Sequence, residues 1–343
     1  MVEKGAHGLE NDTLRSWMEP VEPFLGPLHD VAKAFTGLTG VPVDIPTALF
    51  LRADLTGLPL PGRVSAGGSC HLLETADGWA AVNLARADDL AAVPALVALL
   101  GGAGTEEPHE AARGAAAAEV AAHAQLLGIA AAAHGSARGT RAPVRAERGG
   151  AASPRDPAGL RIVDFSALWA GPLCARLLGA AGARIVKVES TTRPDGARRG
   201  SPAFYRWLHD GHESLVLDFA SGAPAEVVAE ADVVIEASRP RALRRLGIHA
   251  EEFLAARPGR VWLSITGYGR DEDRIAFGDD AAVAGGLTGI DGAGAPVFLG
   301  DALADPVTGV FAAHAVARSL ADGGGELLGL SMAACAAALT DSR

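Results

Sequence analysis

The sequence predicts an α/β protein with one domain on a mostly parallel sheet and a second, smaller α+β domain. Short β-branched runs alternate with helical patterns after residue 160. A hairpin pattern and Ala-rich helices occupy about 62–134, and a Gly-, Pro-, Ser- and Arg-rich stretch lies between the two patterns. We therefore expect an N-terminal region at 1–134 that holds the small domain, a linker at 135–159, and a large domain at 160–343.

The large domain contains five expected strands, separated mostly by turns and helical runs. The strands are R-I-V-D-F (161–165), R-I-V-K-V-E (184–189), S-L-V-L-D-F (214–219), A-D-V-V-I-E-A (231–237) and R-V-W-L-S-I-T (260–266). This alternation produces βαβ units with right-handed crossovers. Ligands of such sheets bind beyond the carboxyl ends of the strands, so we expect the functional residues in the loops that follow them.

The small domain is predicted from a hairpin at residues 62–84. One strand ends near Glu74, Asp77 and Gly78 form a tight turn, and W-A-A-V-N-L returns. Two Ala-rich helices are expected near 87–101 and 107–128. Residues 1–60 show weak helical signals around 22–36 and many prolines, and they receive no assignment.

Composition excludes several classes of function. The net charge of −11 argues against a general nucleic-acid binder and against binding to anionic membranes. The Ala-rich run at 115–134 carries Glu and His side chains, so it is not a membrane span. Three scattered cysteines and a polar N-terminus favour a reduced, cytoplasmic protein without disulfides. The histidines show no metal-ligand spacing, so no metal site is expected.

Asp305 is the strongest candidate for a catalytic residue. It lies in P-V-F-L-G-D-A-L-A-D-P-V-T-G (296–309), directly before a proline that suits the first position of an apolar helix. The helix N-terminus favours a carboxylate that stays ionised, and such a group can act as a nucleophile. The alternative for Asp305 is a simple N-cap. Asp301, in the same loop, is the competing carboxylate.

A nicotinamide enzyme is disfavoured because the first strand is followed by S-A-L-W-A-G-P. The phosphate-binding G-x-G-x-x-G pattern of dinucleotide-binding proteins is absent at that position.

These residues resemble family III CoA-transferases, also called the CaiB/BaiF family. The resemblance covers residues 160–340 and rests on blocks in a fixed order. They are L-R-I-V-D-F-S-A-L-W-A-G-P-L, G-A-R-I-V-K-V-E, S-L-V-L-D-F, A-D-V-V-I-E-A-S-R-P-R-A-L-R-R-L-G-I, P-G-R-V-W-L-S-I-T-G-Y-G and the segment around Asp305. The resemblance implies a Rossmann-like large domain and an enzyme that moves CoA between carboxylic acids.

The N-terminal hairpin H-L-L-E-T-A-D-G-W-A-A-V-N-L resembles the small domain of the same family, which usually follows the catalytic Asp. The chain therefore looks circularly permuted. The resemblance also implies a homodimer, whose subunits interlock in this family. No permanently bound cofactor is expected, and acyl-CoA and a carboxylic acid are the expected substrates.

The resemblance assigns roles to individual residues. Asp305 becomes the nucleophile that attacks the acyl-CoA thioester. The implied CoA-binding residues are Trp169, Ala170, Ala237, Ser238, Arg239, Arg245, Gly267 and Tyr268. Arg193, together with Arg198 and Arg199, either meets the CoA phosphates or forms a solvated surface. Gly67 and Gly68 are either the glycine loop that closes over the active Asp or a simple turn.

Two departures from the family pattern keep alternatives open. The basic motif before the third strand, roughly N-R-G-K-R-S, is replaced by H-D-G-H-E-S (209–214), which binds phosphate less well. The G-H-D of the 2-methylacyl-CoA racemases is G-D-D here (278–280), so the racemase base is missing. The alternatives to a transferase are a racemase or α-proton lyase of the same family, and a non-catalytic acyl-CoA-binding homologue.

Overall fold

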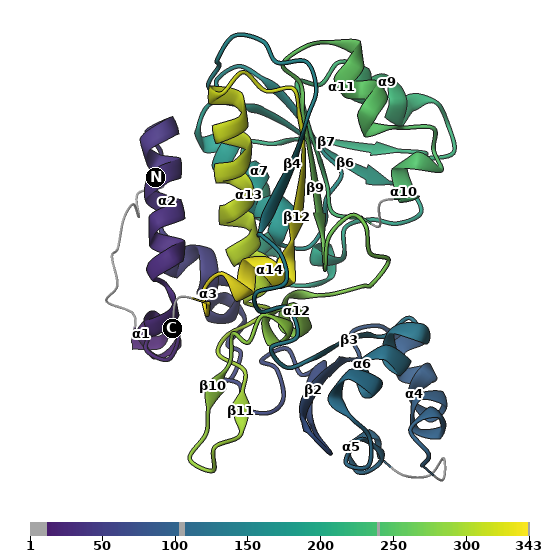
Figure 1. The fold of residues 1–343 in the computed structure, drawn as a ribbon. Helices are drawn as coiled ribbons and strands as arrows, with labels where there is room; N and C mark the ends of the chain where they lie inside the picture. Colours follow the sequence, from purple (N-terminus) through teal and green to yellow (C-terminus); the bar gives the residue numbers. More distant parts are fainter. Residues whose placement is uncertain (1–11, 103–106, 239–240, 342–343) are drawn as a thin grey trace.

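The computed structural model describes residues 12–102, 107–238 and 241–341 (Figure 1). A seven-stranded sheet with helices on both faces forms the large domain, and a three-stranded sheet with three helices forms the small domain. The fold class is therefore the one that the sequence predicts. Among the described residues, no helix is both long and apolar enough to cross a membrane.

The large sheet has the strand order of a doubly wound α/β fold. Along the sheet the strands are β4 (Val144–Arg148), β12 (Glu326–Ser331), β9 (Val261–Thr266), β8 (Val233–Glu236), β5 (Arg161–Asp164), β6 (Arg184–Ser190) and β7 (Glu213–Leu217). All neighbours are parallel except β4, which pairs antiparallel with β12. The chain reverses its direction of winding between β5 and β8, which is where such sheets open a ligand crevice.

The five predicted strands are all present, with ends that shift by at most two residues. The strands β4 and β12 were not predicted. β4 lies inside the stretch expected to be a linker, and its polar sequence V-R-A-E-R suits an exposed sheet edge. β12 reads E-L-L-G-L-S, which has no β-branched residue and follows three glycines.

Helices cover both faces of the large sheet. They are α7 (Ala170–Ala180), η2 (Gly196–Arg199), α8 (Pro202–His209), α9 (Ala223–Ala229), α10 (Arg241–Arg244), α11 (Ala250–Ala256), α13 (Ala304–Ala321) and α14 (Met332–Ala337). The helix α12 (Gly278–Ala284) packs instead against α14 and the small domain. Ile162 of β5 belongs to the core under α7 and α13, whereas Val163 belongs to the core under α9 and α11. Burial on both faces explains the continuous apolar runs of these strands.

The N-terminal helices belong to the large domain. They are α1 (Asp12–Met18), η1 (Glu22–Phe24), α2 (Gly26–Thr39) and α3 (Ile45–Thr56). Figure 1 shows α2 running beside α13, and the side chains of Leu28, Phe35 and Phe50 join the same core as Val310. Residues 12–56, which the sequence left unassigned, therefore complete a domain whose sheet begins after residue 140.

The small domain follows the predicted hairpin. Its strands are β1 (Cys70–Thr75), β2 (Gly78–Asn83) and β3 (Ala130–Ala133), and its helices are α4 (Ala87–Leu99), α5 (Pro108–Ala112) and α6 (Ala117–Leu126). Thr75 pairs with Gly78, so the turn is Ala76-Asp77, one residue earlier than expected. The strand β3 consists of four alanines, which carry no periodic signal. A short hairpin of β10 (Gly289–Ile290) and β11 (Pro296–Val297) extends near this domain (Figure 1).

Candidate active site

Asp305 lies in the first turn of α13, which begins one residue earlier, at Ala304. Asp305 is therefore the second helical residue, and it is not an N-cap: the cap position is Leu303, without a side-chain hydrogen bond. Asp305 was expected to be extended, directly before a helix that starts at Pro306, and that expectation was wrong. The residue is half-buried, and the backbone N–H of Gly278 donates a hydrogen bond to its carboxylate.

Gly278 lets the N-termini of α12 and α13 approach each other closely. A Cβ atom at this position would lie 2.2 Å from the carbonyl oxygen of Ala302 and 2.7 Å from Oδ2 of Asp305. No side chain fits there without moving backbone atoms, so glycine is required. The loop that carries Asp305 is consequently held against the first turn of α12.

Asp279, Asp280, Asp301 and Asp305 form a group that we call the carboxylate cluster. The first three are buried. Asp279 accepts a hydrogen bond from the backbone N–H of Ala302 at 2.9 Å, which ties α12 to the loop that carries Asp305. Asp280 accepts from the side-chain amide of Asn83 at 3.1 Å and from the backbone N–H of Phe277 at 2.9 Å. The other oxygen of Asp280 has no hydrogen-bond partner among the described residues.

The electrostatics of the cluster correct one expectation. Burial raises the pKa of Asp305 to about 7, Arg52 lowers it, and Asp279 and Asp301 raise it. Burial likewise raises the pKa of Asp279, with a contribution from Asp301, and that of Asp280, each to about 7. The sequence predicted that the helix N-terminus keeps Asp305 ionised. Desolvation and neighbouring carboxylates outweigh that effect, because burial disfavours the charged form.

Asp301, the competing carboxylate, is engaged elsewhere. It is fully buried, and Nε of Arg52 lies 2.5 Å from its Oδ2 while Nη2 contacts Oδ1. The guanidinium carbon of Arg52 also lies 5.0 Å from the centre of the Trp169 ring. Because both oxygens of Asp301 bind Arg52, Asp305 is the more accessible of the two carboxylates.

Two residues at this edge of the sheet have left-handed backbone conformations although they carry side chains. Ala302, in the loop that carries Asp305, has φ 47°, and Leu168, in the loop after β5, has φ 69°. Such conformations are costly and persist only where the surrounding contacts enforce them. Both belong to loops that the sequence assigns to the site.

The expected CoA-binding residues follow strands β5, β8 and β9, which are neighbours in the sheet. Trp169 and Ala170 are buried at the start of α7, and Gly267 and Tyr268 are buried after β9. Ala237 is exposed and Ser238 is half-buried after β8. Arg239 lies outside the described residues. Burial and the charge of Asp280 raise the pKa of Tyr268, so the loop after β9 lies near the carboxylate cluster.

The remaining predicted cations lie on the surface. Arg193 and Arg245 are exposed. Arg198 forms an ion pair with Glu189 at 2.6 Å. Arg198 therefore has a structural partner, whereas Arg193 keeps both of the interpretations that the sequence left open.

The Gly67-Gly68 turn lies at the edge of the cluster. Both glycines are exposed, and Gly68 adopts φ 79° in a turn closed by its N–H and the carbonyl of Ser65 at 2.8 Å. The hydroxyl of Ser65 is hydrogen-bonded to Asp279. The turn thus follows directly on a residue that touches the cluster.

The small domain and α3 supply groups that sequence reasoning missed. Asn83, Ser65 and Arg52 contact Asp280, Asp279 and Asp301, respectively. All three precede the large sheet in the chain. No local pattern marks them, because their partners lie far along the sequence. One chain therefore brings both domains to the same cluster.

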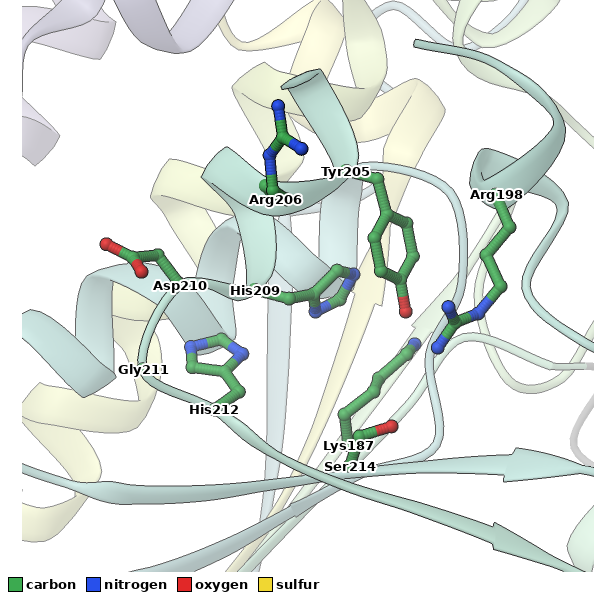
Figure 2. Close-up of a pocket in the computed structure, with 9 residues that line it drawn as sticks. All are labelled: Lys187, Arg198, Tyr205, Arg206, His209, Asp210, Gly211, His212 and Ser214. Atoms are coloured by element: carbon green, nitrogen blue, oxygen red, sulfur yellow. The ribbon is translucent and has the colours of Figure 1, made fainter. Parts of the chain in front are cut away.

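The altered basic motif lines a cavity of about 270 Å³ beside α8, and Asp305 is not among the residues that line it (Figure 2). His209, Tyr205 and Lys187 point toward one another there. Burial and the charge of Lys187 lower the pKa of His209 to about 3, and burial together with Arg176 lowers that of His212 to about 4. Both imidazoles are thus neutral at neutral pH and do not replace a basic phosphate-binding motif. Among the described residues, no group of three or more His, Cys, Asp and Glu side chains could hold a metal ion.

A doubly wound sheet with a ligand crevice at the carboxyl ends of its strands is typical of the α/β enzymes, many of which bind nucleotides. Sequence comparison narrows that class. The sequence model described as CoA-transferase family III matches residues 158–343, so the chain belongs to this family. The match begins just before the first predicted strand of the large domain and includes the whole loop that carries Asp305.

Individual relatives agree with this family. A succinyl-CoA–L-malate CoA-transferase β subunit of Chloroflexus aurantiacus is 33% identical over 180 residues, 48% of this chain and 44% of that protein. A succinate–glutarate CoA-transferase of Agrobacterium fabrum is 29% identical over 184 residues, 47% and 46% of the two chains. A crystal structure of a CAIB/BAIF family protein from Brucella suis aligns with a TM-score of 0.50 and 26% identity, over 56% and 57% of the chains. This chain spans less than half the length of the two curated relatives.

Proposed function

We propose that this protein transfers CoA from an acyl-CoA donor to a carboxylic acid acceptor, with Asp305 as the nucleophile. The observation that carries the proposal is the position of Asp305: a half-buried carboxylate in the first turn of α13 that accepts a hydrogen bond from Gly278, while the competing Asp301 is occupied by Arg52. The family and the relatives' names support the class of reaction.

The first half of the proposed reaction transfers CoA to the enzyme. A carboxylate oxygen of Asp305 attacks the thioester carbonyl carbon, the C–S bond breaks, and CoA leaves as the thiolate. The product is a mixed anhydride between Asp305 and the acyl group. The thiolate then attacks the carbonyl carbon of Asp305, which releases the donor acid as a carboxylate and leaves an aspartyl-CoA thioester.

The second half reverses these steps with the acceptor. The acceptor carboxylate attacks the aspartyl thioester and releases CoA thiolate, and the thiolate attacks the acceptor carbonyl of the new anhydride. Asp305 returns as a carboxylate, so no net proton is consumed. The Gly278 N–H, which already binds the Asp305 carboxylate, is placed to hold charge on that group during both halves.

In our proposal, the two domains of a single chain together form the complete site. Small-domain residues contact the same carboxylate cluster as the large domain, which supports a permuted chain that still assembles a two-domain site. A homodimer is also part of the proposal, and light scattering measures it: a monomer with full activity would contradict the dimer and leave the one-chain site standing.

The decisive experiment is mass spectrometry of the intact protein after incubation with a panel of acyl-CoAs that begins with succinyl-CoA. Samples are treated with hydroxylamine and digested, with Asp305→Ala and Asp301→Asn beside the wild type. We expect a hydroxamate on the Asp305 peptide in the wild type and in Asp301→Asn, but not in Asp305→Ala.

Two other outcomes lead to other functions. Solvent deuterium at the α-carbon of the acyl-CoA, without an adduct, would indicate a racemase or lyase. Neither signal, with a melting temperature that rises on addition of CoA, would indicate an acyl-CoA-binding protein without catalysis.

A further inference from the structure

Arg52 faces the carboxylate cluster from outside the family-matched region. It belongs to α3 (Ile45–Thr56), more than a hundred residues before the first matched residue, 158. Its side chain is 34% exposed and forms a two-pronged ion pair with Asp301, which is 0% exposed. A guanidinium in this arrangement is fixed in direction as well as in place, because both prongs must align with one carboxylate.

The cluster contains more acids than cations. Asp279 and Asp280 reach it from α12, Asp301 and Asp305 from the nucleophile loop, and Arg52 from α3. The other contacts are uncharged at neutral pH: the Trp169 ring at the start of α7, and Ser65, Asn83 and the thiol of Cys70 from the small domain. Burial and neighbouring carboxylates raise the pKa of Asp279, Asp280 and Asp305, whereas Arg52 lowers that of Asp279 and Asp305.

The loop between Asp301 and Asp305 is the element through which Arg52 can act. It contains Ala302 in a left-handed conformation and is tied to α12 by the Asp279–Ala302 hydrogen bond. The ion pair with Arg52 is the second attachment of this loop. Without it, Asp301 would be a buried carboxylate with no cation, and the loop would lose its link to α3.

We propose that Arg52 is a positioning residue of the active site: through its ion pair with Asp301 it holds the loop that carries Asp305, and it places a positive charge beside that carboxylate. This inference rests on the proposed function. The readiness of the nucleophile then depends on a helix outside the residues that define the family match. The lowering effect of Arg52 on the pKa of Asp305 agrees with this role.

The test is the pH dependence of kcat/KM for Arg52→Gln, Arg52→Lys and Asp301→Asn. Removing a cation raises the pKa of a neighbouring carboxyl by about one unit or more, so in Arg52→Gln the acid limb should move up by about one pH unit. That shift corresponds to about a tenfold loss below the limb, with recovery above pH 8. Asp301→Asn removes a negative charge and should move the limb in the opposite direction. Arg52→Lys should keep the limb near that of the wild type.

A control separates this role from general damage. Arg113 pairs with Glu74 on the surface at 3.7 Å, and Arg113→Gln should leave the profile unchanged. A rate that falls equally at every pH in Arg52→Gln, without a moved limb, would overturn the proposal. If Arg52→Gln does not fold, Asp301→Asn and Arg52→Lys decide: an unmoved limb in Asp301→Asn also overturns it.

A second measurement does not need catalysis. Carboxyl signals of ¹³C-aspartate-labelled protein are titrated by NMR, and the signal missing in Asp305→Asn is assigned to Asp305. A higher titration midpoint in Arg52→Gln supports the role of Arg52 even if no acyl-CoA is turned over, in which case only the proposed function fails. An unchanged midpoint overturns the inference even if the enzyme is an active transferase.

Discussion

Two buried groups of charges stand at the strand ends of this protein, and they differ in balance. In the carboxylate cluster, Arg52 interacts with three of the four acids, Asp279, Asp301 and Asp305. Around β6 and η2, which we call the paired cluster, Lys187 meets Asp195 at 3.1 Å and Asp164 at 3.8 Å, while Arg198 meets Glu189 at 2.6 Å. Each acid of the paired cluster has a cation within reach.

The pKa values follow this difference. Burial raises the pKa of Glu189, but hydrogen bonds from Arg198 and the backbone of Asp195 outweigh it and lower the value to about 2. In the carboxylate cluster no such excess of donors exists, and three acids have a pKa of about 7. Asp164 is the exception in the paired cluster, because burial raises its pKa despite Lys187. Balanced charges hold the fold, and unbalanced charges are available for chemistry.

The largest expected effect is a loss of catalytic activity without a loss of stability. Asp305→Asn removes the nucleophile and should lower the transfer rate by about 10³-fold or more. Its melting temperature at pH 8 should equal or exceed that of the wild type, because a buried ionisable group is gone. Steady-state kinetics measure the transfer rate, and thermal unfolding measures the melting temperature. A variant that retains a tenth of the activity would place the nucleophile elsewhere.

The matching change in the paired cluster should break the fold. Lys187→Met leaves Asp195 and Asp164 buried without their cation, which should cost about 3–5 kcal/mol of unfolding free energy. Urea denaturation measures the loss. A surface control, Arg113→Gln, should change the value by less than about 0.5 kcal/mol. If Lys187→Met is as stable as this control, the paired cluster is not structural.

Asp280→Asn tests how much stability the protein loses because this buried carboxylate has no cation beside it. The folded-state pKa of about 7 lies above the ordinary value of 3.8, so the folded protein holds this proton between pH 4 and 7 and loses stability as pH rises through that window. Asn keeps the acceptor for Asn83 and carries no charge. We expect a gain of up to about 4 kcal/mol above pH 7 and little gain near pH 4. A pH-independent difference in melting temperature would contradict this explanation.

Glu189→Gln should show the opposite pH dependence and the smallest effect. Its folded-state pKa of about 2 lies below the ordinary 4.5, so its contribution is complete above pH 4.5 and disappears as pH falls toward 2. Arg198 is 42% exposed, and solvent screening reduces the loss at pH 7 to about 1 kcal/mol. Unfolding curves of the two proteins that stay apart at pH 2 would exclude the charge as the cause.

The fold was predictable where the sequence carries a strong local signal. The runs around Val163, Val186 and Val234 are β-branched and buried on both faces, so their strands could be predicted. The strand β3 has four alanines, which fit a helix as well as a strand, and β12 has leucines and a glycine. Those strands form because neighbouring strands provide hydrogen-bond partners, which a local pattern does not show.

The sequence predicted site residues of the large domain, but not the residues from α3 and the small domain that contact the cluster. Asp305 was predicted from its loop and its proline, and Trp169 from its place after a strand. Arg52 lies 249 residues from Asp301, and Asn83 lies 197 residues from Asp280, so neither pairing leaves a trace in local spacing. The raised pKa of Asp305 could not be predicted either, because it depends on burial and on carboxylates from another helix.

The place of β12 governs the order in which a newly made chain can fold. On the ribosome, β4 and β9 emerge before β12, the strand that joins them in the finished sheet. Until Glu326–Ser331 has emerged, β9 keeps an open edge, and open edges are templates for aggregation. Likewise, the helix α2 cannot pack into the core until α13, the helix that it contacts there, has been synthesised. The yield of folded protein thus depends on how long the emerging chain is protected before its final strand arrives.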